Sequence, residues 1–82
     1  MPKRADEGFV EVEAAQTLES RIAAKLRALR DKKGLTQYQA ADGAKVGRRT
    51  YCTWEAGERL PSGRYLAQLA EFYGTTIGKL LA

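Results

Sequence analysis

Alternating helix-stop and helix-start residues divide most of this chain into short segments. Glycines that can end a helix stand at positions 34, 57 and 74, Gly47 can cap the start of a helix, and hydroxyl residues precede three apolar runs, at Thr36, Ser62 and Thr76. Glycine ends a helix by adopting the left-handed conformation, and a hydroxyl side chain accepts a hydrogen bond from an unpaired amide of the first turn. These signals predict short helices at about residues 18–33, 37–43, 48–56 and 63–73, followed by a helical turn that Thr76 opens.

The first of these segments places its apolar residues on one helix face. They recur every three or four positions, at Leu18, Ile22, Leu26 and Leu29. The chain has 82 residues, of which 44% are hydrophobic and only two are prolines, and it lacks the long β-branched run of a sheet protein. Such a chain forms one small domain with a limited core. We therefore predict an all-α fold, a compact five-helix domain over residues 17–82.

The beginning of the chain differs from the rest in pattern and in charge. Residues 1–16 show no helical period and are interpreted as a flexible acidic arm, whose stretch FVEVE (9–13) is either an edge strand or irregular. Residues 1–19 carry a net charge of −3, and residues 20–82 carry +7. A basic domain behind an acidic arm indicates a polyanionic partner, although solubility alone also explains many small basic domains.

The composition argues against several classes of protein. Cys52 is the only cysteine, and histidine is absent, so the chain has neither an internal disulfide nor the commonest metal ligand and acid-base group. We expect Cys52 to be a small, partly buried residue in a reducing, cytoplasmic setting. There is no glycine-rich phosphate loop, no nucleophile beside a base, and no apolar run of about 18 residues. We predict no enzyme activity, no cofactor or metal, no small-molecule ligand and no membrane association.

Three stretches of the sequence share a pattern with known DNA-binding domains. GLTQ (34–37) opens the second helix, with the small Ala41 following, WEAGERLPS (54–62) closes the third, and LAQLAEFYGTTIGKLL (66–81) covers the last two. In this order and spacing they resemble the helix-turn-helix family of the phage repressor and Cro type over residues 18–81. The resemblance implies five helices, of which the third enters the major groove of DNA.

The chain departs from the family pattern in the second helix and the turn after it. Alanines stand at Ala40 and Ala44, where larger aliphatic residues are usual, and Lys45 stands where the family has glycine. Since a Leu-to-Ala change in a fixed core costs about 2–5 kcal/mol, we expect Tyr51 and Trp54 to supply the missing bulk. Lys45 either keeps the left-handed turn, at a strain of about 1 kcal/mol, or the turn is reshaped.

Two adjacent arginines begin the third helix, at Arg48 and Arg49. The helix macrodipole disfavours cations at this end, so a negative group outside the chain would resolve the conflict. Given the resemblance, that group is DNA. Arginine binds guanine O6 and N7 through two hydrogen bonds. We expect Arg49 and Thr53 to contact bases and Arg48 to contact both bases and phosphate, whereas a solvated, charged helix start is the plainer reading.

Other residues align with positions that contact the DNA backbone in this family. Thr36, which forms a capping box with Gln39, begins the second helix together with Gln37. The full set expected at phosphates is Thr36, Gln37, Arg27, Lys45 and Arg59, all of which also suit an ordinary helix surface. Arg30 and Glu55 align with an internal ion pair that joins the first helix to the third.

One recognition helix reads only a few base pairs, so we expect a homodimer on double-stranded DNA. The candidate contact is the apolar C-terminal end, with Tyr73, Ile77, Leu80 and Leu81. Alternatively Ile77 and Leu80 complete the core of a monomer, and the arm from Phe9 to Glu13 is a second possible dimer element. The predicted function is a transcriptional regulator, in particular a repressor. The alternative is a protein-interaction or antitoxin-like module whose acidic arm engages a basic partner.

Overall fold

A computed structural model describes residues 17–82. The expected flexible arm and its possible edge strand, residues 1–16, lie outside the described residues. The described part contains the helices α2 (Leu18–Lys33), α3 (Gln37–Ala44), α4 (Arg48–Glu55), α5 (Gly63–Tyr73) and α6 (Ile77–Leu81), and no strand. The all-α prediction is confirmed, and each predicted helix end agrees with the structure to within one residue.

Local capping explains where these helices begin and end. Gly34 and Gly74 take the left-handed conformation, with φ of 70° and 69°, and end α2 and α5. The Thr36–Gln39 capping box is present, with both hydrogen bonds formed. Ser62 occupies the position before α5, but its side chain makes no capping hydrogen bond, so its predicted role is confirmed for the backbone position alone.

Lys45 keeps the left-handed turn between α3 and α4, at φ 63°. This conformation costs a non-glycine residue about 1 kcal/mol or more. Two hydrogen bonds hold the turn in place: from outside the turn, Gln68 Nε2 of α5 donates to the Ala44 carbonyl at 3.1 Å, and within it the Val46 amide donates to the Ala41 carbonyl at 3.0 Å. Of the two alternatives for this turn, the strained one is therefore present.

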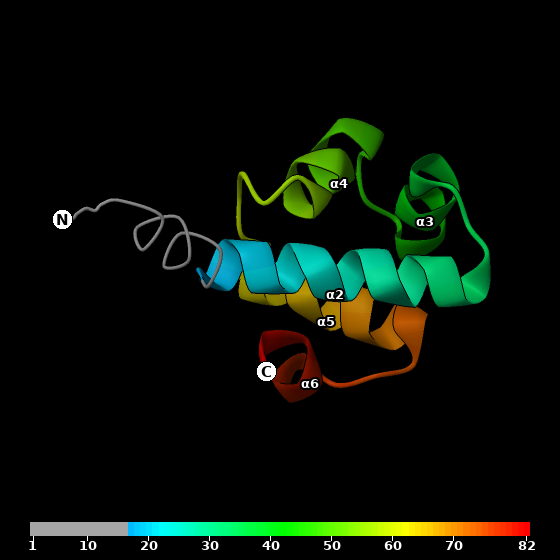
Figure 1. The fold of residues 1–82 in the computed structure, drawn as a ribbon. Helices are drawn as coiled ribbons and strands as arrows, with labels where there is room; N and C mark the ends of the chain where they lie inside the picture. The colour runs from blue at the N-terminus through cyan, green and yellow to red at the C-terminus, as the bar shows by residue number, and fades with distance from the viewer. Residues whose placement is uncertain (1–16) are drawn as a thin grey trace, which may run out of the picture.

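The helices pack on two sides of α2. Figure 1 shows α3 and α4 together on one side of α2 and α6 on the other, and both α4 and α6 contact α2 directly. Helix α5 contacts α3 and α6 and so closes the domain. As a result, the surface of α4 and the surface between α2 and α6 face away from each other.

The core confirms the expectation that large side chains of α4 fill the volume left by the alanines of α3. Ala40, Ala41 and Ala44 are buried in the same core cluster as Tyr51, which is 0% exposed, and Trp54, which is 3% exposed. The Tyr51 hydroxyl lies 2.6 Å from the Tyr73 hydroxyl. Burial raises the pKa of Tyr51, and hydrogen bonds with Tyr73 and Glu55 raise it further, so this phenol stays protonated across the physiological range.

We expect Tyr51→Ala to lower the free energy of unfolding by about 3–5 kcal/mol, because it leaves a cavity that the neighbouring alanines cannot fill. Urea unfolding followed by circular dichroism measures the loss. Tyr38→Ala is the matched control, since Tyr38 is 54% exposed, and it should change stability by less than about 1 kcal/mol. Equal losses in the two variants would contradict this assignment of the core.

Candidate nucleic-acid interface

A buried carboxylate fixes the end of α4. Glu55, the last residue of α4, is 2% exposed. Its Oε2 accepts a hydrogen bond from Arg30 Nε of α2 at 2.8 Å, and its Oε1 accepts one from Gln37 Nε2 of α3 at 3.1 Å. Arg30 also donates to the Leu35 carbonyl at 2.9 Å, so the group joins α2, α3 and α4. The ion pair expected between Arg30 and Glu55 is thus present in the structure.

The electrostatics of this site favour the charged forms of both partners. Burial alone would raise the pKa of Glu55, but hydrogen bonds from Arg30, Tyr51 and Gln37, together with the charge of Arg30, outweigh it and lower the pKa. The hydrogen bond to Glu55 raises the pKa of Arg30, against the opposing effect of burial. Glu55 is therefore ionised at neutral pH although it is buried.

The opposite end of α4 is exposed to solvent. Arg48, Arg49 and Thr50 are all exposed, whereas Tyr51 and Trp54 on the other side of the helix are buried. The helix is thus held at its C-terminal end and along one side, and it presents its N-terminal turn. A ligand that binds this turn meets a helix whose position is already fixed, which lowers the entropic cost of binding.

Arg48 has a negative partner inside the chain. Its Nη2 and Nε donate to the two oxygens of Asp42, at 3.0 and 3.3 Å, and its guanidinium lies 4.8 Å from the ring centre of Tyr38. The hydrogen bond lowers the pKa of Asp42 and raises that of Arg48. Asp42 therefore offsets part of the unfavourable interaction between Arg48 and the helix macrodipole. The sequence alone suggests only a negative group outside the chain for this role. The sequence alone does not reveal this contact, because it depends on how α3 meets α4.

The other predicted base-reading residues differ in how free they are. Among the described residues, the exposed side chain of Arg49 forms no hydrogen bond or ion pair. Thr53 is half-buried, and its hydroxyl donates to the Thr50 carbonyl at 2.7 Å. Cys52 is a half-buried free thiol, 3.5 Å from Gln37 Oε1. Arg49 is thus the side chain of α4 that is most available to a ligand.

The structure gives several predicted phosphate-binding side chains a partner within the protein. The hydroxyl of Thr36 accepts the capping hydrogen bond, and the amide of Gln37 faces Glu55. Arg27 Nη1 donates to the backbone carbonyl of Glu55. Lys45 and Arg59 are exposed. Gln37 and Arg27 thus also help to hold α4, and the expected contacts of all five residues with phosphate stay a prediction.

The predicted dimer residues also divide into two groups. Tyr73 and Leu80 are 8% and 1% exposed, inside the domain's own core. Ile77 is 38% exposed, and Leu81 packs against the edge of the core and is half-buried. Leu80 is buried because α6 packs on α2, a surface that the sequence pattern of α6 alone does not reveal. Only Ile77 and Leu81 retain surface for a partner.

A helix-turn-helix family model matches residues 26–80. The cryptic phage CTXphi transcriptional repressor RstR of Vibrio cholerae is 37% identical over 61 residues, 74% of this chain and 55% of RstR. The HTH-type transcriptional activator BcrR of Enterococcus faecalis is 38% identical over 58 residues, 71% of this chain and 28% of BcrR. The chain therefore aligns with only about half of RstR and less of BcrR.

No solved structure matches the chain significantly. Within residues 17–82, no helix is long and apolar enough to cross a bilayer. Over the same residues, histidine, cysteine and acidic side chains form no group of three or more that would hold a metal ion.

The lowered pKa of Glu55 makes stability depend on pH. A carboxyl whose pKa is lower in the folded state stabilises the fold above its unfolded value, about 4.3 for glutamate, and loses this contribution as the pH falls through the folded pKa. We expect Glu55→Gln to lose about 3–5 kcal/mol at pH 7, because Arg30 loses its charged partner. The difference in free energy of unfolding between wild type and Glu55→Gln should narrow as the pH falls from about 5 to about 3.

Urea unfolding at a series of pH values measures this gap. Asp42→Asn is the control, because its pair with Arg48 is exposed, with side chains 57% and 56% accessible. Its effect should be smaller and should disappear in high salt. A constant difference between wild type and Glu55→Gln from pH 7 to pH 3 would show that folding does not lower the pKa of Glu55.

Proposed function

We propose that this chain, which belongs to the helix-turn-helix family of the phage repressor type, is a sequence-specific transcriptional regulator that binds operator DNA. The family model covers residues 26–80, so residues 17–82 are taken as the DNA-binding domain. A transcriptional repressor and a transcriptional activator are both among its relatives. We favour repression, in the cytoplasm, and the family assignment supports a regulator rather than an enzyme.

The observation that carries the proposal is the exposed arginine pair on a fixed helix. Helix α4 is held by the buried Glu55 at one end and presents Arg48 and Arg49 at the other. Family members insert the N-terminal part of this helix into the major groove. Phosphates and base edges then supply the negative groups that the helix dipole and the two cations require.

The two arginines have different roles in this proposal. Arg49, free within the described residues, reads a guanine edge, with Thr53 beside it on the next turn. Arg48 donates to Asp42 through Nε and Nη2, which form one edge of its guanidinium group. Its Nη1 group remains available, so Arg48 contacts DNA while Asp42 and Tyr38 fix its direction. Such restraint lowers the entropy lost when a long side chain is ordered on binding.

The DNA backbone is proposed to lie against the first turn of α3. The amides of Gln37 and Tyr38 have no protein partner among the described residues, since the capping box uses those of Gln39 and Thr36. Free amides at a helix start bind phosphate oxygens. Lys45 and Arg59 are exposed and add positive charge, whereas Thr36, Gln37 and Arg27 contribute mainly by holding the helices in position.

We expect Arg49→Ala to weaken operator binding by about 1–3 kcal/mol and to relax the preference at one base position in each half-site. Competition binding against single-base operator variants measures both effects. Arg21→Ala is the matched control, because Arg21 is an exposed arginine of α2 that lines a hollow beside Ala82. It should leave selectivity unchanged. A selectivity profile for Arg49→Ala identical to wild type would exclude base reading by this residue.

The regulator is further proposed to act as a homodimer. One recognition helix contacts few base pairs, and pairing two of them about 34 Å apart gives the specificity that a genome requires. Ile77 and the outer part of Leu81 remain exposed at one end of the domain after α6 has covered the core. They provide an apolar contact that two copies can share about a two-fold axis.

Sedimentation of wild type and Ile77→Glu at micromolar concentration tests the dimer. We expect the wild type to dimerise and Ile77→Glu to weaken association about tenfold or more, because a buried charge without a partner is costly. Leu60→Glu is the control, since Leu60 is 42% exposed in the segment between α4 and α5. A wild-type monomer that binds half-sites without cooperativity would contradict the homodimer.

A further inference from the structure

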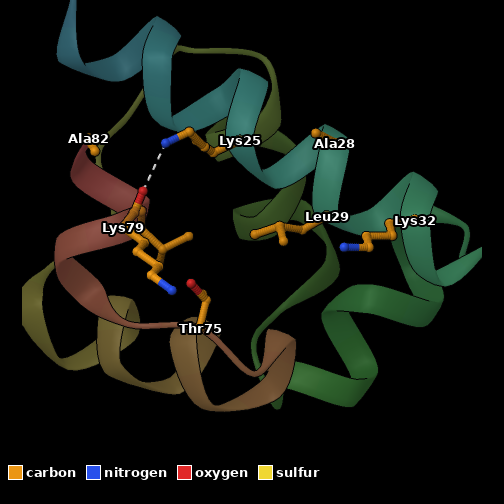
Figure 2. Close-up of a pocket in the computed structure, with 8 residues that line it drawn as sticks. Lys25, Ala28, Leu29, Lys32, Thr75, Lys79 and Ala82 are labelled. Atoms are coloured by element: carbon orange, nitrogen blue, oxygen red, sulfur yellow. Dashed lines mark hydrogen bonds between the residues drawn. The ribbon is translucent and has the colours of Figure 1, made fainter.

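The face of α2 opposite α4 carries an apolar hollow with a basic rim. The hollow has a volume of about 360 Å³ and lies between α2 and α6, as Figure 2 shows. Its lining combines apolar with basic side chains: Lys25, Ala28, Leu29, Lys32, Thr75, Lys79, Leu80 and Ala82. A second hollow, of about 300 Å³, is lined by Arg21 and Ala24 and shares Lys25, Ala28 and Ala82 with the first. We call the two together the α2–α6 groove.

Positive charge at the rim of this groove is not neutralised by the folded domain. Lys25 Nζ donates to the Lys79 carbonyl at 2.8 Å (Figure 2). In residues 17–82, none of Arg21, Lys25, Lys32 and Lys79 forms an ion pair with a carboxylate. An apolar floor between unneutralised cations suits an acidic, amphipathic segment.

We propose that residues 9–14 of the same chain bind in the α2–α6 groove as an extended segment that runs back along α2. In an extended chain, successive side chains point to opposite sides. Val10, Val12 and Ala14 therefore share one side, and Glu11 and Glu13 share the other with Phe9. The apolar side fits the floor formed by Ala28, Leu29 and Leu80, while the glutamates reach the basic rim.

The length of the chain allows this contact within one molecule. Ala28 lies ten residues beyond the start of α2 at Leu18, or about 15 Å along the helix axis. The seven residues from 11 to 17 span up to about 23 Å when extended. A short tether also gives the segment an effective concentration of the order of millimolar. At micromolar protein, the chain's own segment is thus favoured over a second copy.

Binding of this segment would make the two faces of the domain differ in net positive charge. The acidic arm would neutralise the rim of the α2–α6 groove and leave the cations of the α4 surface exposed. This consequence rests on the proposed DNA binding, because only then does an uncovered basic rear face offer a competing site for phosphates. The docking itself depends on the groove and the segment alone, so its test contains no DNA.

Paramagnetic relaxation in the full chain tests the docking. A nitroxide label is attached through Glu7→Cys in a Cys52→Ser background. The same chain without the nitroxide serves as the reference. We expect at least a twofold loss of amide signal at Ala28, Leu29, Leu80 and Ala82 and no loss in α4. Chemical shifts of α4 establish that the Cys52→Ser chain keeps its fold.

Isotopic dilution separates contacts within a chain from contacts between chains. A nitroxide-labelled, ¹⁵N chain in a tenfold excess of unlabelled ¹⁴N chain should keep the full effect. An effect that vanishes on dilution would assign the groove to a second copy, and uniform or absent broadening would mean that the arm does not dock; either result overturns the proposal.

Two groups of variants identify the chemistry of the contact. Ala28→Glu, at an exposed position of the groove, should abolish the local signal loss, whereas Ala67→Glu, at an exposed position of α5, should leave it intact. The double variant Glu11→Gln with Glu13→Gln should reduce the loss of amide signal at least twofold. The double variant Val10→Ser with Val12→Ser should reduce it by as much. Retention of the full effect in Ala28→Glu would overturn the assignment to this groove.

Discussion

The buried carboxylate of Glu55 is the interaction on which the position of α4 depends. It accepts hydrogen bonds from Arg30 of α2 and Gln37 of α3, and its backbone carbonyl accepts one from Arg27. Such a pair adds little net stability compared with an apolar replacement, yet loss of one partner is costly because the other charge remains buried. The network's contribution is therefore mainly geometric, since its hydrogen bonds join three helices at one carboxylate. In that arrangement the N-terminal turn of α4 is exposed.

This arrangement gives the domain two faces of different character. The α4 surface carries arginines that are exposed and, for Arg48, oriented by Asp42 and Tyr38. Figure 1 shows α6 on the side of α2 away from α4, and the α2–α6 groove there combines an apolar floor with lysines. We propose different negative partners for the two faces: for the first a duplex with a groove that admits a helix, and for the second a thin acidic segment with small apolar side chains.

The helices themselves were predictable because their ends are specified locally. Gly34, the Thr36 capping box and Gly74 each act within one turn, and the burial of Tyr51 followed from the volume missing at Ala40 and Ala44. Contacts between long side chains of different helices were not predictable. The inward direction of Gln37 and the Asp42–Arg48 pair depend on how α3 meets α4. Tyr73 and Leu80 look like surplus apolar residues until α6 is packed on the rest of the domain.

The most direct test of the account is to map where selected DNA touches the protein. Duplexes enriched from a random library would be titrated into ¹⁵N-labelled full chain, and the chemical-shift changes of each amide recorded. If α4 reads the DNA, the largest changes fall on residues 48–53 and on the first turn of α3, with little change at Ala24 and Ala28. Failure to enrich any sequence, or the largest changes in the α2–α6 groove, would contradict DNA reading by α4.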